Sequence, residues 1–426
     1  MPVRTRWRMA AWLLMVGVCP LAGAEPWPSW RGPQNNGVSS ETGLAESWST
    51  TENVAWKLPM PGQAGATPVV WGDRMFVVSA ADKDILLLCI DTTTGQEVWR
   101  RTVGTGNNQV MRGEGNSASP SPSTDGEHVW AFAGTGDLVC FDYAGNEVWR
   151  MDVQKKYGQF DIQFGMTSSP LLDGDRLYLQ LLHSASKKIV ALHSKTGDEA
   201  WVHVRQSDAY AENEHAYTSP MLYRDGEREF LVTHGADYVI AHRLTDGSEI
   251  WRCGGINPQG AGYNEYLRFV ASPVVTPGLI VVPTAKNGPV LALRPDATGD
   301  ITAEAAAHAW KFPDNTPDVP SPLVHDGLVY LCRENGVLLC LDAATGEEQY
   351  KSRLHSDVYR GSPVYGDGRV YVASRDGTVS VVAAGRKFAK LAEISMGEPI
   401  SSSPVISEGT IFLRTYENLY AIRPAQ

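Results

Sequence analysis

Residues 89–99 read CIDTTTGQEVW, and related stretches recur along the chain. The recurrences are ALHSKTGDEAW (191–201), AHRLTDGSEIW (241–251), CLDAATGEEQY (340–350) and the shorter CFDYAGNEVW (140–149). Each has an apolar start, a turn containing Gly and a second run that ends on a large aromatic residue. This pattern predicts two antiparallel strands joined by a tight turn. Its recurrence indicates a repeat architecture.

A Ser-Pro or Thr-Pro dipeptide opens each repeat, and the spacing between successive dipeptides is 41 to 54 residues. The eight dipeptides are Thr67-Pro68, Ser121-Pro122, Ser169-Pro170, Ser219-Pro220, Ser272-Pro273, Ser321-Pro322, Ser362-Pro363 and Ser403-Pro404. After each dipeptide come a few apolar residues, a Gly/Asp turn and then an alternating β run, such as RMFVVS in the first repeat or RVYVAS in the seventh. Each unit therefore predicts a four-stranded antiparallel sheet.

Four-stranded units of this length are the blades of a β-propeller. The sequence predicts an all-β, eight-bladed β-propeller, in which neighbouring sheets bury their faces against each other. Because Trp is a large apolar plate, we expect the recurrent Trp residues to pack between blades rather than to stack on a ligand.

The eighth unit runs from Ser403 to Gln426 and has room for only three strands. The stretch ENVAWKL around Trp56 has the pattern of a fourth strand without a repeat of its own. We therefore expect this N-terminal strand to complete the last blade. Such closure removes the sheet edges that an open ring would expose.

The first 24 residues have the layout of a secretory signal peptide. Arg4, Arg6 and Arg8 precede an apolar run over 9–18, and small residues precede a cleavage point after Ala24. No later stretch approaches the ~20 apolar residues of a membrane span. We expect a periplasmic or extracellular protein without a transmembrane segment.

The predicted organisation is a signal peptide (1–24), an N-terminal extension (25–52) and the propeller (53–426). The net charge of −11 disfavours nucleic acid as a partner, since phosphate backbones require a basic surface. A monomer is expected.

Cys89, Cys140 and Cys340 occupy equivalent repeat positions where other repeats carry Ala, which is typical of small buried side chains. Cys332 and Cys340 can also face each other across one hairpin, so a disulfide stays open, as does the state of Cys253. No C-x-x-C pair occurs, and no metal site is predicted.

In a four-stranded blade, the links between blades and the second-to-third turns lie on the same face. The extra length falls in those links, over 104–118, 154–168, 206–218, 253–271 and 312–320. Long loops on a rigid scaffold usually carry function. We therefore expect the binding site in the axial funnel on this face.

The candidate ligand-binding residues come from these links and from later repeats. They are Asn116, Arg112, Glu214, His215, Tyr217, Arg268, Asp318 and Arg360. The arginines suit an anionic ligand, since guanidinium groups bind carboxylates bidentately. Glu214 and His215 suit a divalent ion or a solvated polar loop. Tyrosines and asparagines suit a peptide or glycan. No catalytic residue is predicted, because no G-x-S-x-G, H-E-x-x-H or P-loop motif occurs.

The pattern A-x-D-x-x-T-G-x-x-x-W resembles the tryptophan-docking motif of the PQQ-repeat superfamily. The match is nearly full at Asp91, Thr94, Gly95 and Trp99, and partial elsewhere. The opening WPSWRGPQNNGVS (27–39) is similar to the start of many bacterial secreted PQQ-like repeat proteins. The resemblance covers essentially the whole chain after residue 24.

Two branches of that superfamily matter. Quinoprotein alcohol dehydrogenases hold PQQ and calcium in the funnel, whereas BamB-type assembly proteins have the ring without a cofactor. This chain has neither the adjacent cysteines that dehydrogenases often carry nor a C-x-x-C-H haem motif. The resemblance thus implies a non-catalytic scaffold of the cell envelope, without a cofactor, that binds a protein or a small anionic or glycan ligand. A PQQ- and calcium-dependent dehydrogenase and a carbohydrate-binding propeller are the alternatives.

Overall fold

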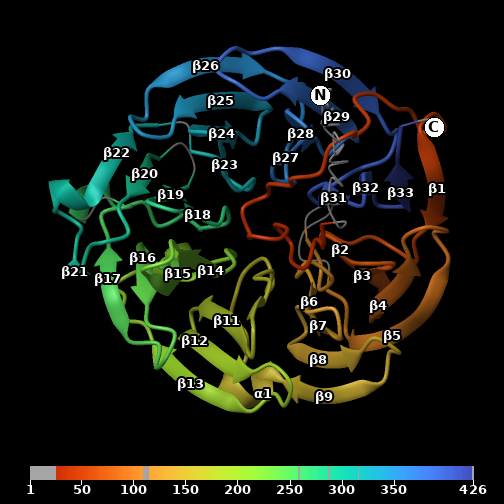
Figure 1. Cartoon of the computed structure of the whole chain (residues 1–426). Coiled ribbons are helices and arrows are strands. Elements are labelled where there is room, and N and C mark those ends of the chain that lie inside the picture. Colours follow the sequence, from red (N-terminus) through yellow and green to blue (C-terminus); the bar gives the residue numbers. More distant parts are fainter. Residues whose placement is uncertain (1–24, 109–114, 258–259, 286–287, 315, 425–426) are drawn as a thin grey trace, which may run out of the picture.

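A computed structural model describes residues 25–108, 115–257, 260–285, 288–314 and 316–424. Eight sheets stand radially around a central axis (Figure 1). Seven sheets have four strands and one has five. The predicted eight-bladed, nearly all-β propeller is therefore confirmed. The proposed signal peptide, residues 1–24, lies outside the described residues. None of the helices in the described part of the chain has the length and apolarity needed to cross a bilayer.

In blades one to seven the strands pair in chain order from the axis outward, whereas in blade eight the N-terminal β1 follows β31, β32 and β33 at the outer edge. Blade one contains β2 (Val69–Trp71), β3 (Arg74–Ala81), β4 (Asp84–Asp91) and β5 (Glu97–Thr105), and blade two contains β6 (Ser123–Thr124), β7 (His128–Phe132), β8 (Asp137–Asp142) and β9 (Glu147–Asp152). Blade three contains β10 (Leu171–Asp173), β11 (Arg176–His183), β12 (Ser186–His193) and β13 (Glu199–Val204). Blade four contains β14 (Met221–Arg224), β15 (Glu229–Gly235), β16 (Tyr238–His242), β17 (Glu249–Cys253) and the added β21 (Gly299–Asp300).

Blade five contains β18 (Val274–Thr276), β19 (Leu279–Pro283), β20 (Val290–Leu293) and β22 (His308–Phe312), and blade six contains β23 (Leu323–His325), β24 (Leu328–Cys332), β25 (Val337–Asp342) and β26 (Glu348–Arg353). Blade seven contains β27 (Val364–Gly366), β28 (Arg369–Ala373), β29 (Thr378–Ala383) and β30 (Lys390–Ser395). Blade eight contains β31 (Val405–Ser407), β32 (Thr410–Arg414), β33 (Asn418–Ile422) and β1 (Val54–Pro59). The short helices are α1 (Val153–Tyr157), η1 (Ala211–Glu214), η2 (Gly260–Gly262) and η3 (Ala305–Ala307).

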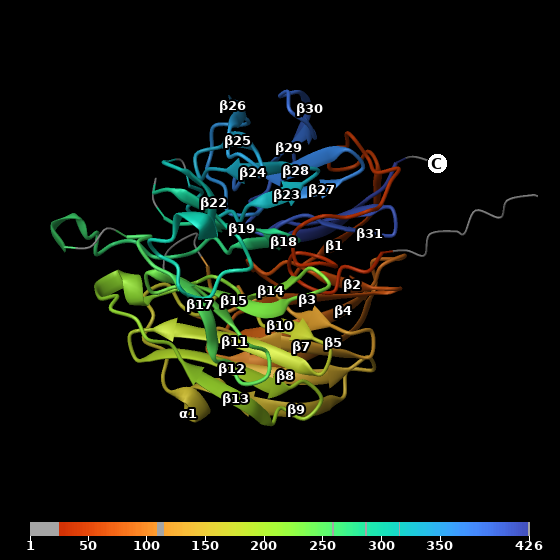
Figure 2. The same ribbon diagram turned by 60° about the vertical axis from the view of Figure 1, so that its left-hand side comes forward.

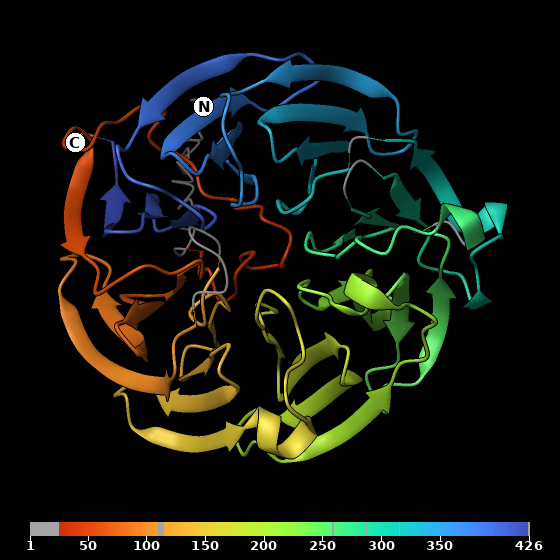
Figure 3. The same cartoon turned by 180° about the vertical axis from the view of Figure 1, so that it is seen from behind.

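The N-terminal strand closes the ring, as the sequence predicts. Strand β1 pairs antiparallel with β33, with Trp56 opposite Ala421 and Leu58 opposite Leu419. Seen from behind, β1 (red) lies beside the dark-blue C-terminal blade (Figure 3). The two ends of the chain thus share one sheet, and both would have to separate for the ring to open.

The recurrent tryptophans pack between blades. Trp56 of blade eight donates its indole N–H to the Thr92 carbonyl of blade one at 2.9 Å. The same contact recurs from Trp99 to Tyr143 at 2.9 Å and from Trp310 to Ala343 at 2.8 Å. These three indoles cover the Gly turns of the next blades at Gly95, Gly145 and Gly346, so the motif couples neighbouring blades where its Trp is docked.

The fifth repeat departs from this pattern. Its segment after β20 adds strand β21 in parallel to the outer edge of blade four, with Gly299 beside Trp251. The short helix η3 follows before β22 begins. The Thr298-Gly299 turn therefore extends the preceding sheet instead of docking under an indole.

The N-terminal extension crosses the axis of the ring (Figure 1, red). Trp27 exchanges backbone hydrogen bonds of 2.8 Å with Val70, and Thr124 N–H donates to the Pro28 carbonyl at 2.9 Å. Farther along, Ser39 N–H donates to the Tyr365 carbonyl at 3.0 Å. These contacts lie at the far ends of the innermost strands, so the extension crosses the face opposite the interblade links.

Arg31 is the buried centre of this extension, with a relative exposure of 1%. Its guanidinium donates to the carbonyls of Pro322 at 2.6 Å, Asn36 at 3.0 Å and Pro363 at 2.8 Å. Burial lowers the pKa of Arg31 to about 9, which is still above neutral pH, so the group keeps its charge there. One side chain thereby fastens the extension to blades six and seven.

The five cysteines in the described residues are free and buried, so the disulfide left open for Cys332 and Cys340 does not form. Cys332 lies opposite Leu338 and Cys340 opposite Tyr330, so the two are offset by two positions along the hairpin. Burial raises the pKa of Cys340 to about 12, which keeps the thiol protonated and unreactive.

We predict that Gly95→Ala destabilises the ring more than the matched Gly299→Ala. Both glycines have a left-handed φ, +70° and +77°, so each substitution costs about 1–2 kcal/mol in backbone strain. Only at Gly95 would the added Cβ lie 2.5 Å from the Trp56 ring, whereas no atom lies within 4 Å at Gly299. Displacing the indole adds about 1–3 kcal/mol. Chemical denaturation measures both values, and equal losses would contradict the docking role of Trp56.

Candidate functional site

A cavity of about 280 Å³ opens on the axis, on the face that carries the interblade links. Its wall is built from the residues just before each innermost strand, and Trp30 of the N-terminal extension reaches it from the opposite face. The wall also includes the larger or polar side chains of Trp30, Gln63, Asn116, Phe164, Tyr217, Arg268, Asp318, Arg360 and Tyr416. The predicted position of the site in the funnel thus coincides with a cavity.

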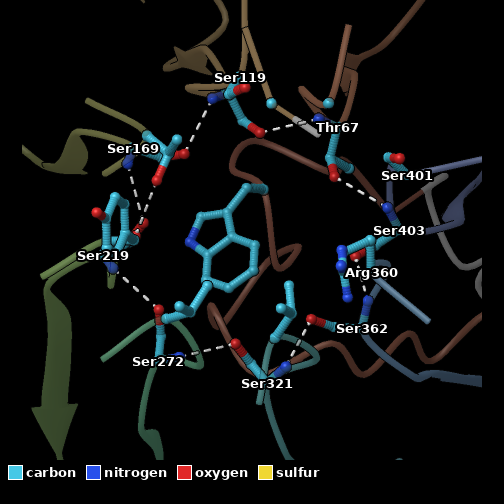
Figure 4. A pocket seen from close by; sticks show the side chains of 18 of the residues that line it. Thr67, Ser119, Ser169, Ser219, Ser272, Ser321, Arg360, Ser362, Ser401 and Ser403 are labelled. Carbon is cyan, nitrogen blue, oxygen red and sulfur yellow. Dashed lines mark hydrogen bonds between the residues drawn. The ribbon is translucent and has the colours of Figure 1, made fainter. Parts of the chain in front are cut away.

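The Ser and Thr residues of the eight dipeptides form a closed hydrogen-bonded ring in this cavity (Figure 4). Each backbone N–H donates to the hydroxyl oxygen of the equivalent residue in the next blade. The first seven bonds are each 2.9 Å long, from Thr67 N–H around to Ser362 N–H. Ser403 N–H closes the circuit on the hydroxyl of Thr67 at 3.2 Å.

Proline follows each ring residue and has no N–H of its own. The Ser/Thr hydroxyl can therefore accept the backbone N–H of the neighbouring blade without competition from the backbone amide of the next residue. The Ser/Thr-Pro dipeptide at every repeat suits this arrangement.

Among the described residues, two guanidinium groups line the cavity. Arg268 lies 4.7 Å from the Phe164 ring centroid and 3.5 Å from a Glu212 carboxylate oxygen. Arg360 donates to Glu334 at 2.6 Å. Neither glutamate lines the cavity, but Asp318 does, so in the described residues the wall carries two guanidinium groups and one carboxylate.

Asn116 and Tyr217 complete the polar wall. The Asn116 amide donates to the Gln63 carbonyl at 2.9 Å. The Tyr217 hydroxyl accepts the Phe164 N–H at 3.2 Å. Burial raises the pKa of Tyr217, so its hydroxyl stays neutral.

The structure places five of the predicted site residues on the cavity wall: Asn116, Tyr217, Arg268, Asp318 and Arg360. Arg112 lies outside the described residues. Glu214 and His215 are not on the wall, because they contact residues of the third blade instead. Glu214 accepts from Lys187 at 2.7 Å, and the His215 ring nitrogen Nε2 lies 2.9 Å from the Ser184 hydroxyl. Burial lowers the pKa of His215.

The residues that sequence reasoning missed are the ring hydroxyls and Trp30. The eight Ser/Thr-Pro dipeptides were visible as repeat markers, and their regularity was the available signal. A residue that opens every innermost strand must lie beside the axis. Trp30 lies in an irregular segment, so no periodicity indicated that it reaches the funnel.

A second feature of the same face is a tyrosine-rich knob, formed by residues 208–214 and 260–266 of two interblade links. The rings of Tyr210 and Tyr263 stack at 4.3 Å with 16° between their planes. The Tyr263 hydroxyl donates to Asp237 at 2.6 Å, and the Asn213 amide donates to the Asn264 carbonyl at 2.9 Å. These links stand out from the ring in Figure 2.

The knob combines internal hydrogen bonds with exposed aromatic surface. Tyr210 is 47% exposed and Tyr266 is 62% exposed. Such tyrosines offer contact area at small entropic cost, because the surrounding loops are already held in place.

The repeats, the docked tryptophans and the closed ring define a PQQ-like β-propeller. The chain belongs to the family described as outer membrane protein assembly factor BamB, whose profile matches residues 38–119, 83–308 and 297–426. It is 22% identical over 374 residues to the outer membrane protein assembly factor BamB of Burkholderia pseudomallei (strain K96243), covering 85% of each chain.

Solved structures share the fold at low identity. BamB from Moraxella catarrhalis has a TM-score of 0.64 at 13% identity, covering 87% of this chain and 99% of that one. A europium-containing methanol dehydrogenase has a TM-score of 0.71 at 12% identity, covering 94% and 98%. At such identity these likenesses establish the fold alone.

The cavity does not fit the calcium and PQQ of quinoprotein dehydrogenases. Calcium takes six to eight oxygen ligands, carboxylates prominent among them. Within the described residues, Asp318 is the one carboxylate on the cavity wall. The sequence also lacks the adjacent cysteines often found over PQQ.

Proposed function

We propose that this protein is a non-catalytic scaffold of the bacterial cell envelope that binds other proteins through the tyrosine-rich knob. The observation that carries the proposal is the exposure of the Tyr210 and Tyr266 side chains on the loop-bearing face. Membership of the BamB family supports it, since the family description names outer membrane protein assembly.

The knob has the chemistry of a protein-binding surface. Tyrosine is enriched among the residues that dominate interface energetics. The stacked Tyr210–Tyr263 pair is already fixed, so little side-chain entropy is lost on docking. The knob also contains Asp208 and Glu265, which add acidic groups to it. A partner with an apolar centre and basic surroundings therefore fits best.

A location in the periplasm follows from the same proposal. The predicted cleavage after Ala24 would release the propeller into that compartment. There a monomeric ring would work at the inner surface of the outer membrane. The partner class that we propose is the machinery that assembles outer-membrane proteins.

The Tyr210→Ala/Tyr266→Ala double variant should bind the purified outer-membrane assembly complex at least about tenfold more weakly than the native chain. Truncating hot-spot aromatics costs about 2 kcal/mol or more, and about 1.4 kcal/mol corresponds to tenfold in affinity. Surface interferometry measures the affinity, and thermal unfolding confirms that the variant is folded.

The matched control is Val204→Ala, which trims an apolar side chain that is 52% exposed and lies on β13 at the outer rim. The control should bind like the native chain. Unchanged affinity in the double variant, or an equal loss in the control, would count against the knob as the docking surface.

Adding PQQ and calcium to the purified protein distinguishes the scaffold from the quinoprotein dehydrogenase alternative. Since Asp318 is the one carboxylate that the described residues place on the wall, we expect no quinone absorption band and no alcohol-dependent dye reduction after adding PQQ and calcium. Spectrophotometry after removal of unbound quinone measures both. A retained band with dye reduction would replace the scaffold by a dehydrogenase. Binding to a glycan array would instead favour the carbohydrate-binding alternative.

A further inference from the structure

The eight ring hydroxyls are hydrogen-bond donors that face the cavity without a protein acceptor. Each accepts a backbone N–H, yet none of the eight donates its own proton to any group in the described part of the chain. All eight residues are buried, with exposures from 2% for Ser272 to 6% for Ser169 and Ser219. A buried donor needs a partner, because leaving it unpaired costs free energy.

The ring geometry also strengthens these donors. A hydroxyl that accepts a hydrogen bond becomes polarised and donates its own proton more strongly. The backbone amides themselves are occupied by the neighbouring hydroxyls. The ring therefore presents O–H groups to the axis, and these are suited to an anion or another strong acceptor.

An independent observation points to the same ligand charge. Arg31 lies directly beneath the ring, since it donates to the carbonyls of Pro322 and Pro363, which follow ring residues Ser321 and Ser362. It is fully buried, and its described partners are carbonyl oxygens without any carboxylate. A buried positive charge without a counter-charge attracts an anion strongly through a medium of low dielectric constant.

The remaining wall indicates which anion. Trp30, Phe164, Tyr217, Val270, Val319 and Tyr416 supply flat and apolar surface, which an inorganic ion would leave uncovered. We propose that the funnel is a binding site for a small organic carboxylate. Its carboxylate takes hydrogen bonds from the ring hydroxyls, and its apolar body packs on Trp30.

The inference goes beyond the scaffold role and does not depend on it. The site lies on the axis, whereas the proposed protein-binding knob lies on two outer links. A carboxylate in the funnel has two sources of the same chemistry: a free organic acid, or the C-terminal carboxylate of a peptide inserted along the axis. Failure of either proposal leaves the other testable.

Isothermal titration of the full mature chain with benzoate tests the proposal. We expect saturable binding, and binding at least about tenfold weaker for benzyl alcohol, which keeps the ring but lacks the charge. Equal binding of the two compounds, or no saturable heat from either, would overturn the proposal. This comparison needs no variant and so cannot fail through misfolding.

Ring variants locate the site. Ser321→Ala removes one hydroxyl, whereas Ser321→Thr keeps it, and Thr67 shows that the ring accommodates threonine. We expect weaker benzoate binding in Ser321→Ala by about tenfold and near-native binding in Ser321→Thr. Loss of binding in both variants, or in neither, would place the ligand elsewhere. Thermal unfolding of each variant checks the fold.

Titration with a peptide distinguishes the two sources of the carboxylate, a free organic acid and the C-terminus of a peptide. Tetra-alanyl-phenylalanine is titrated with a free and with an amidated C-terminus. Tighter binding of the free acid than of benzoate supports a peptide end as ligand, and tighter binding of benzoate supports a free acid. Equal binding of the free and amidated peptides, together with no preference for benzoate over benzyl alcohol, overturns the carboxylate site.

Discussion

The circuit of hydrogen bonds from Thr67 through Ser403 and back to Thr67 is the constraint on which the rest of the structure depends. Each bond joins one blade to the next at the axis, where the innermost strands begin. Because the circuit is closed, no blade can tilt or shift without lengthening bonds on both of its sides. The uniform 2.9 Å spacing of the first seven bonds therefore fixes the angular position of every blade.

Two further layers of contact support this inner ring. Farther out, docked tryptophans join several of the Gly turns to the preceding blade, and Trp56 closes the same seam that Ser403 closes at the axis. Beneath the ring, Arg31 fastens the N-terminal extension to blades six and seven. Rigid blades leave the interblade links free to vary, and for this reason the cavity and the tyrosine-rich knob occur on the same face.

Much of the fold was predictable because it is periodic. The docking motif predicted a hairpin in each repeat, the eight dipeptides predicted where each blade begins, and the stretch around Trp56 predicted the strand that completes the last blade. Together these features predicted one closed ring. The site was less predictable, since it depends on which side chains meet. Arg268 and Arg360 lie on the wall as expected, but Glu214 pairs with Lys187 and His215 with Ser184 within blade three. The ring hydroxyls were interpreted only as the starts of the repeats, although their regular spacing places them beside the axis. Trp30 lies in an irregular segment, so no periodicity indicated its position. The parallel strand β21 arises from a decayed repeat and had no sequence pattern of its own.

The most direct test of the closed ring compares amide hydrogen exchange at its seam with exchange at its middle. Under native conditions, the Ser403 N–H, which closes the circuit, and the Ser219 N–H, midway along the chain, should exchange at similarly slow rates. Exchange at either amide should require nearly global unfolding, because a local movement cannot break one bond of a closed circuit and leave the others in place. Exchange at Ser403 that is orders of magnitude faster than at Ser219 would show that the seam opens independently, and would contradict the account.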